Sequence, residues 1–147
     1  MVDSKKELLT YLDERAIDSK IYLAEDATET TDADLWLAHN YPFSWWGRID
    51  WQKVSNSAKR LWSSYTDVVE IFQQLVIEQQ LEDTEVFITW DGQLVLEIQL
   101  SELLEADEKL FQMAWDTWIF SPQHGWCIEC YHEGELCFGY SPIQALN

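Results

Sequence analysis

Two stretches in the second half of the chain, residues 85–98 and 125–140, alternate apolar and polar residues on either side of a glycine. In the later stretch, GWCIECYHEGELCFGY, a three-residue loop at residues 132–134 would leave one hairpin face apolar throughout. A slip of one residue would turn every side chain of a strand to the other face, so the apolar face selects the register. The pairs predicted to lie opposite each other are Cys130 and Leu136, Ile128 and Phe138, and Trp126 and Tyr140.

The earlier stretch, EVFITWDGQLVLEI, allows the same test. A two-residue turn at Asp91 and Gly92 would mix polar side chains into the apolar face. A three-residue loop at residues 90–92 instead keeps one face apolar and places Gly92 in the left-handed position. This loop predicts Ile88 opposite Leu94 and Val86 opposite Leu96.

Helical patterns lie between and before these hairpins. Ser64 followed by Asp67 resembles a capping signature, and apolar residues then recur with helical spacing to about Leu81. Asp3 or Ser4 can cap a first helix, and Ser101 can cap another within residues 101–111. Residues 20–24 and 116–121 read as strands, and residues 32–39 allow a short helical turn. The pattern predicts one α+β domain over residues 1–147, an antiparallel sheet built from hairpins with helices packed on one face.

The charge of the chain is strongly unbalanced, with 27 Asp and Glu against 9 Lys and Arg and a net charge of −18. Within residues 61–147, Lys109 is the single basic residue. Such a surface repels nucleic acid and anionic membranes and attracts basic partners. We therefore expect a basic protein partner, no nucleic acid and no membrane.

Four potential metal ligands, Cys127, Cys130, His132 and Cys137, have the spacing C-x2-C-x-H-x4-C, which by residue type suits zinc. The hairpin register opposes a shared site, because it turns Cys130 to the face opposite Cys127 and Cys137. We expect no metal and no cofactor. Three cysteines and the absence of a secretion-type leader favour a cytoplasmic protein. Glu129, on the face opposite the apolar one, is expected to be solvated or to face a partner.

Known nucleophile, phosphate-loop and metal-helix motifs are missing from the sequence, which predicts a protein without enzymatic activity. The stretch YPFSWWGRIDW, residues 41–51, is aromatic and is interrupted by Pro42 and Gly47. It predicts a packed, non-helical connection with Phe43 and Trp51 buried and with Trp45 or Trp46 partly exposed. Arg48 is expected to pair with Asp50 or with the acidic loop of residues 25–34.

Aromatic and acidic residues together suit recognition of a basic protein, because Trp and Tyr anchor many interfaces. We expect two acidic groups on this surface, one beside the adjacent tryptophans and one before the second-half strands. The candidate binding residues are Glu25, Asp26, Glu29, Asp32, Asp34, Trp45 and Trp46, together with a second patch of Glu82, Asp83 and Glu85.

The motifs WWGRIDW and WDTWIFSPQHGWCIECYHEGELCFG, in a small acidic α+β chain, resemble the immunity proteins of bacterial polymorphic toxins, which include contact-dependent growth inhibition systems. The resemblance rests also on Ile128, Glu129, His132 and Gly134 of the last hairpin. It implies a non-enzymatic inhibitor that binds one cognate toxin, commonly a nuclease. The alternative is an adaptor or scaffold module for another basic protein, and the sequence leaves the oligomeric state open.

Overall fold

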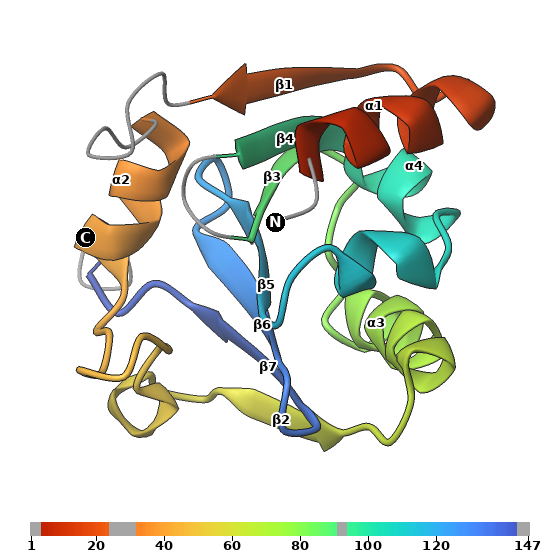
Figure 1. Ribbon diagram of the computed structural model, residues 1–147. Coiled ribbons are helices and arrows are strands. Elements are labelled where there is room, and N and C mark those ends of the chain that lie inside the picture. Colours follow the sequence, from red (N-terminus) through yellow and green to blue (C-terminus); the bar gives the residue numbers. More distant parts are fainter. Residues whose placement is uncertain (1–3, 24–31, 91–93, 144–147) are drawn as a thin grey trace.

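The computed structural model describes residues 4–23, 32–90 and 94–143, which form one seven-stranded antiparallel sheet with helices on both sides (Figure 1). The strand order is β1-β4-β3-β5-β6-β7-β2. The strands are β1 (Ser19–Leu23), β2 (Ala58–Leu61), β3 (Glu85–Thr89), β4 (Leu94–Gln99), β5 (Thr117–Ser121), β6 (Trp126–Tyr131) and β7 (Glu135–Tyr140). The helices are α1 (Ser4–Glu14), α2 (Asp32–Asn40), α3 (Tyr65–Glu78) and α4 (Leu100–Leu104), with 3-10 turns η1 (Trp51–Lys53) and η2 (Glu108–Gln112). The predicted α+β class with an antiparallel sheet is confirmed.

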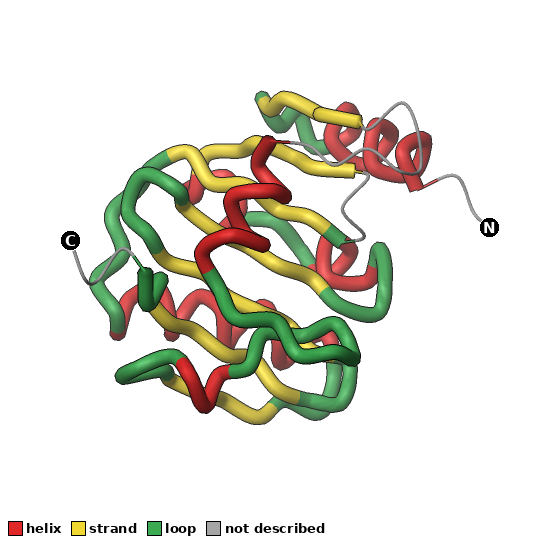
Figure 2. Tube along the Cα trace, turned by 90° about the vertical axis from the view of Figure 1, so that its left-hand side faces the viewer, coloured by secondary structure: helices red, strands yellow, loops and turns green. Residues whose placement is uncertain are grey.

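The main core fills the space between one face of the sheet and the helices α1, α3 and α4. A smaller core lies on the other face of the sheet. There Leu37 of α2 and Tyr41, just after α2, pack against Phe120 and Cys127 of the strands. Figure 2 shows α2 and the loop that follows it in front of the strands. The prediction placed helices on one face, and α2 is the helix that lies on the opposite one. No helix within the described ranges combines the length and apolar character that crossing a bilayer requires.

The predicted register of the β6–β7 hairpin is confirmed at all three pairs, with Cys130 opposite Leu136, Ile128 opposite Phe138 and Trp126 opposite Tyr140. The three-residue loop ends at Gly134, which has a φ of +93°. The backbone amide of Trp62, just after β2, donates to the Gly134 carbonyl at 2.9 Å. The hairpin tip is therefore fixed to the neighbouring strand.

Replacing Gly134 with alanine should destabilise the fold by about 2 kcal/mol, roughly half of it from the left-handed backbone. A Cβ atom at this position would lie 2.9 Å from the Trp62 carbonyl oxygen, closer than such contacts allow. Gly47→Ala is the matched control, because Gly47 has a φ of +95° but nothing within 4 Å of the added carbon. Urea unfolding of both variants tests this expectation, and equal losses would contradict the steric part.

The β3–β4 hairpin has a different register from the predicted one. Ile88 lies opposite Leu96, and Val86 lies opposite Ile98, two residues later than expected. A shift by two leaves the same side chains facing the core, so the apolar alternation does not distinguish the two registers. The predicted loop residue Gly92 lies outside the described residues.

The start of α3 agrees with the sequence, whereas its end at Glu78 comes before the predicted end near Leu81. The Ser64 hydroxyl accepts a hydrogen bond from the Asp67 amide and caps α3, as predicted. The helix predicted within residues 101–111 is instead divided into α4 and η2. Ser101 lies inside α4 and its backbone amide donates to the Asp83 carboxylate at 2.8 Å, so Ser101 is not the cap. The strand β2 was not predicted.

Candidate partner-binding surface

Glu129 is fully buried in β6, on the sheet face covered by the loop after α2. Its carboxylate accepts four hydrogen bonds, two at each oxygen. One oxygen accepts from Arg48 Nε at 3.0 Å and Trp51 Nε1 at 2.9 Å. The other accepts from the Ile49 amide at 2.8 Å and Trp118 Nε1 at 2.9 Å. The expectation of a solvated or partner-facing Glu129 is wrong, because the loop brings enough donors to hold a buried charge.

Arg48 is the cation that neutralises this carboxylate. Its Nη1 also pairs with Glu135 at 3.1 Å, and its guanidinium lies 3.9 Å from the centre of the Tyr131 ring. Burial alone would lower the pKa of Arg48, but the attraction of Glu129 and hydrogen bonds to both carboxylates outweigh it and raise the pKa. The predicted pairing of Arg48 with Asp50 is wrong, and Asp50 pairs with Lys53 instead.

The loop above Glu129 closes as a tight, non-helical turn. Phe43 and Ile49 form an isolated antiparallel bridge, and the Asp50 amide donates to the Pro42 carbonyl at 2.7 Å. The Ser44 amide donates to the Arg48 carbonyl, also at 2.7 Å. These bonds close the base of the loop and leave residues 45–47 at its tip. The predicted non-helical connection is confirmed over residues 41–50, and Trp51 begins the 3-10 turn η1.

The two adjacent tryptophans lie on this tip. Trp45 is 92% exposed and Trp46 is 58% exposed, and their rings meet edge to face at 5.5 Å between centroids. The prediction that one ring would be exposed is confirmed and applies to both. The prediction that Phe43 and Trp51 are buried is wrong, because Phe43 is 38% exposed and Trp51 is only half-buried. The Phe43 ring contacts the Trp118 ring in a tilted arrangement at the rim of the smaller core.

A groove of about 430 Å³ opens beside the Trp46 indole, between the loop and β2. Its walls include Arg48, Lys59, Glu135 and Cys137. The surface beside Trp46 is therefore both hollowed and charged, with basic and acidic side chains lining the same groove. Such a mixture suits a protein partner better than a small apolar ligand.

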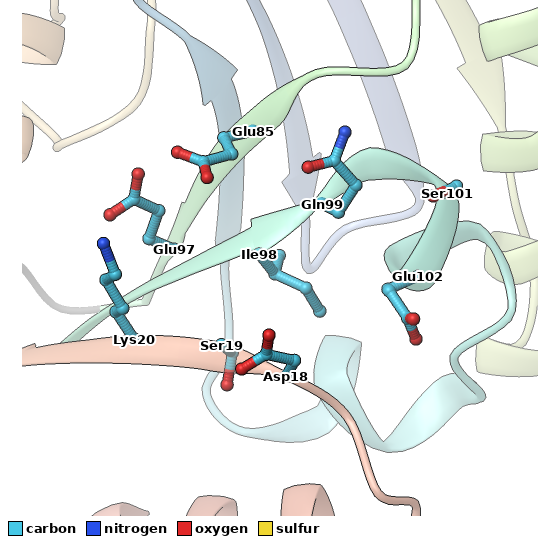
Figure 3. Close-up of a pocket in the computed structure, with 9 residues that line it drawn as sticks. All are labelled: Asp18, Ser19, Lys20, Glu85, Glu97, Ile98, Gln99, Ser101 and Glu102. Carbon is cyan, nitrogen blue, oxygen red and sulfur yellow. The ribbon is translucent and has the colours of Figure 1, made fainter.

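The second predicted acidic patch lies beside a smaller pocket of about 220 Å³, at the β1–β4–β3 edge of the sheet (Figure 3). Glu85 and Glu97 point from neighbouring strands to the same side, with Lys20 close by. The Tyr22 hydroxyl donates to Glu97 at 2.6 Å and lowers the pKa of that carboxyl. A hydrogen bond shared with Glu97 raises the pKa of Glu85.

Asp83 has a structural contact within this patch. Its carboxylate accepts the Ser101 amide at the start of α4, and this hydrogen bond lowers the pKa of Asp83. Glu82 is exposed.

The predicted acidic patch and the tryptophan loop lie toward opposite ends of the strands. Glu85 begins β3, which pairs Phe87 with Phe120 and so lies near the end of β5. Arg48 contacts the tip of the β6–β7 hairpin, beside the start of β5. Asp32 and Asp34 lie in the first turn of α2, and the loop with Trp45 and Trp46 follows the other end of that helix. The remaining candidates, Glu25, Asp26 and Glu29, lie outside the described residues.

The cysteines divide between the two faces of the sheet as the confirmed register requires. Cys130 packs in the main core, Cys127 lies in the smaller core, and Cys137 lies opposite Glu129. Burial raises the pKa of Cys130 to about 12 and that of Cys137 to about 11, so both thiols are protonated at neutral pH. Among the described residues, no group of three or more His, Cys, Asp or Glu side chains is arranged to hold a metal.

Two residues with prominent places on this surface were not found by sequence reasoning. Trp115 is 75% exposed just before β5, and Tyr131 lies under the Arg48 guanidinium. The available signal was the confirmed hairpin register, which places Tyr131 on the same face as Glu129. For Trp115, the only signal in the sequence is its position just before a predicted strand.

Residues 10–139 match the family model described as CdiI immunity protein EcoliA0-like. No curated protein and no solved structure matches the chain significantly.

Proposed function

Because this chain belongs to the EcoliA0-like family of CdiI immunity proteins, which neutralise a toxin, we propose that its cognate toxin is a basic domain of the nuclease class. The protein acts by binding rather than by catalysis, which family membership supports. Trp45 and Trp46 form the main contact, and the acidic side chains on the same face of the sheet complement the toxin's basic groove.

The charge of the chain supports a basic target. A nuclease holds nucleic acid through Lys and Arg side chains that face the phosphates. A protein with a net charge of −18 presents carboxylates to such a groove and is steered toward it by long-range attraction. Rapid association matters for an inhibitor of a lethal enzyme, and electrostatic steering acts mainly on the association rate.

The single observation that carries the contact surface is the exposure of two adjacent tryptophans on a closed loop. Trp45 is almost fully exposed, yet the loop below it is held by a buried carboxylate and an arginine. A large apolar ring on a fixed backbone loses little conformational freedom when a partner covers it. Tryptophan is also among the residues that most often dominate binding energy.

We place this activity in the cytoplasm and without a cofactor. The three cysteines are free thiols and buried, the state expected in a reducing compartment. The acidic surface also makes nucleic acid and anionic membranes unfavourable partners.

The experiment that tests the function uses the toxin gene expected beside this one. Expression of that gene alone should arrest growth, and coexpression of this protein should restore it. The purified toxin domain should degrade DNA or RNA, and a stoichiometric amount of this protein should stop the degradation. A neighbouring gene without a toxin domain would count against the proposal, and a toxin that leaves nucleic acid intact would remove the nuclease class.

The basic character of the toxin has a separate test. Binding measured from low to high salt should show an association rate that falls steeply, because screening weakens the attraction between opposite charges. An association rate independent of salt would contradict the electrostatic part of the proposal while leaving toxin binding intact.

A further inference from the structure

Trp115 is a large side chain that neither core contains. It is 75% exposed and lies in the segment between η2 and β5. An indole this exposed contributes little to the fold by burial, and most of its surface is available to a partner.

A continuous series of ring contacts joins Trp115 to the loop that carries Trp45 and Trp46. The centroids of the Trp115 and His132 rings lie 4.7 Å apart, and those of the His132 and Tyr131 rings lie 4.6 Å apart. Tyr131 in turn lies under the guanidinium of Arg48. The series follows the tip of the β6–β7 hairpin around the end of the sheet.

His132 is held in place within this series. Its backbone amide and its Nδ1 both lie 2.9 Å from one carboxylate oxygen of Asp116, the residue next to Trp115. The imidazole is therefore fixed from two directions, by a carboxylate and by the rings on either side. This arrangement gives the Trp115 indole a firm support on its inner side.

The surroundings of Trp115 carry negative charge. Asp116 follows Trp115 and contacts His132, and Glu133 follows His132 at the hairpin tip. Arg48 is already engaged with Glu129 and Glu135. Lys109, the single base of residues 61–147, lines a separate hollow beside α1. An exposed aromatic face next to carboxylates attracts a cation, and a guanidinium suits it best because it can stack and pair at once.

We propose that Trp115 is a second docking point for the toxin, where an arginine side chain of the toxin stacks on the indole beside Asp116. This inference rests on the proposed function and extends the contact surface from the tryptophan loop around the hairpin tip. The toxin would then hold the protein at two aromatic points with the Arg48–Tyr131–His132 series between them.

The test measures binding of the toxin domain encoded beside this gene to the full-length protein and its variants. Trp115→Ala is expected to weaken binding by about 10-fold or more, as at an anchor position. Trp115→Phe keeps an aromatic face and should lose less. Trp115→Arg should lose more than the alanine variant, because it presents a like charge to the toxin's arginine.

Ile77→Ala is the matched control, because Ile77 is also 75% exposed but lies on α3. It should bind as the wild type does, and all four variants should keep the wild-type melting temperature within a few degrees. Wild-type affinity in Trp115→Ala would overturn the docking point while the proposed function stands. Equal toxin affinities of Trp115→Ala and Trp115→Arg would overturn the proposal that the toxin contacts Trp115 through an arginine side chain. A wild-type protein that does not bind the toxin would overturn both proposals.

Discussion

Replacing Glu129 with alanine is expected to lower the free energy of unfolding by about 3–5 kcal/mol, the usual loss when one partner of a buried ion pair is removed. Arg48 would lose its buried partner, and the indole groups of Trp51 and Trp118 would lose their acceptor. The Ile49 amide would also be left unpaired inside the protein. Each unsatisfied buried donor adds its own desolvation penalty.

Glu129→Gln should be nearly as harmful, because an amide keeps only one acceptor oxygen. Two donors approach each oxygen of Glu129, so the amide nitrogen would face two other donors in either orientation. Glu135→Gln is the control, since Glu135 contacts the same arginine from a partly exposed position and should cost less than about 1 kcal/mol. Urea unfolding monitored by tryptophan fluorescence gives the three values. Equal losses at Glu129 and Glu135 would show that the four hydrogen bonds do not stabilise the fold.

Replacing both Trp45 and Trp46 with alanine is expected to weaken toxin binding by more than about 2 kcal/mol, roughly 30-fold, with the melting temperature unchanged within a few degrees. Both rings are exposed, and they contact each other rather than a core. The backbone bonds that close the loop do not involve either side chain. The loss should therefore appear in the complex and not in the free protein.

Calorimetric titration with the toxin domain and thermal unfolding of the free protein separate the two effects. Ile77→Ala again controls for the loss of an exposed apolar side chain. If Trp45→Ala and Trp46→Ala each unfold the protein, the loop belongs to the core and the argument for an aromatic contact fails. If the double variant folds and binds as the wild type does, the contact lies elsewhere on the surface.

Local patterns were enough to predict the β6–β7 hairpin but not the β3–β4 hairpin. In both cases the alternation identifies the face that packs against the helices, and that part of the prediction is correct. Gly134 lies at the end of the β6–β7 loop and agrees with a single loop length. In the β3–β4 hairpin, registers two residues apart bury the same side chains, so the choice depends on contacts with β1 and β5.

The burial of Glu129 could not be predicted from the sequence, because every hydrogen-bond donor to its carboxylate except Trp118 comes from about 80 residues earlier in the chain. The alternation shows that Glu129 faces away from the main core but not what covers that side. A second small core, formed under α2 and its loop, changes a solvated position into a buried one. The exposure of Trp45 and Trp46 was predictable because Pro42 and Gly47 interrupt regular structure around them.

The closed loop that carries the two tryptophans divides into a fixed base and an interchangeable tip. Side chains at positions 48, 49 and 51 are tied to β6 or packed beneath the loop, whereas positions 45 and 46 take no part in closing it. An inhibitor that must follow changes in its target can therefore vary these two positions without loss of its own fold. On the proposed contact surface, selection for a new specificity would act first at this tip. A library randomised at positions 45 and 46 is then the starting point for redirecting the protein to another target.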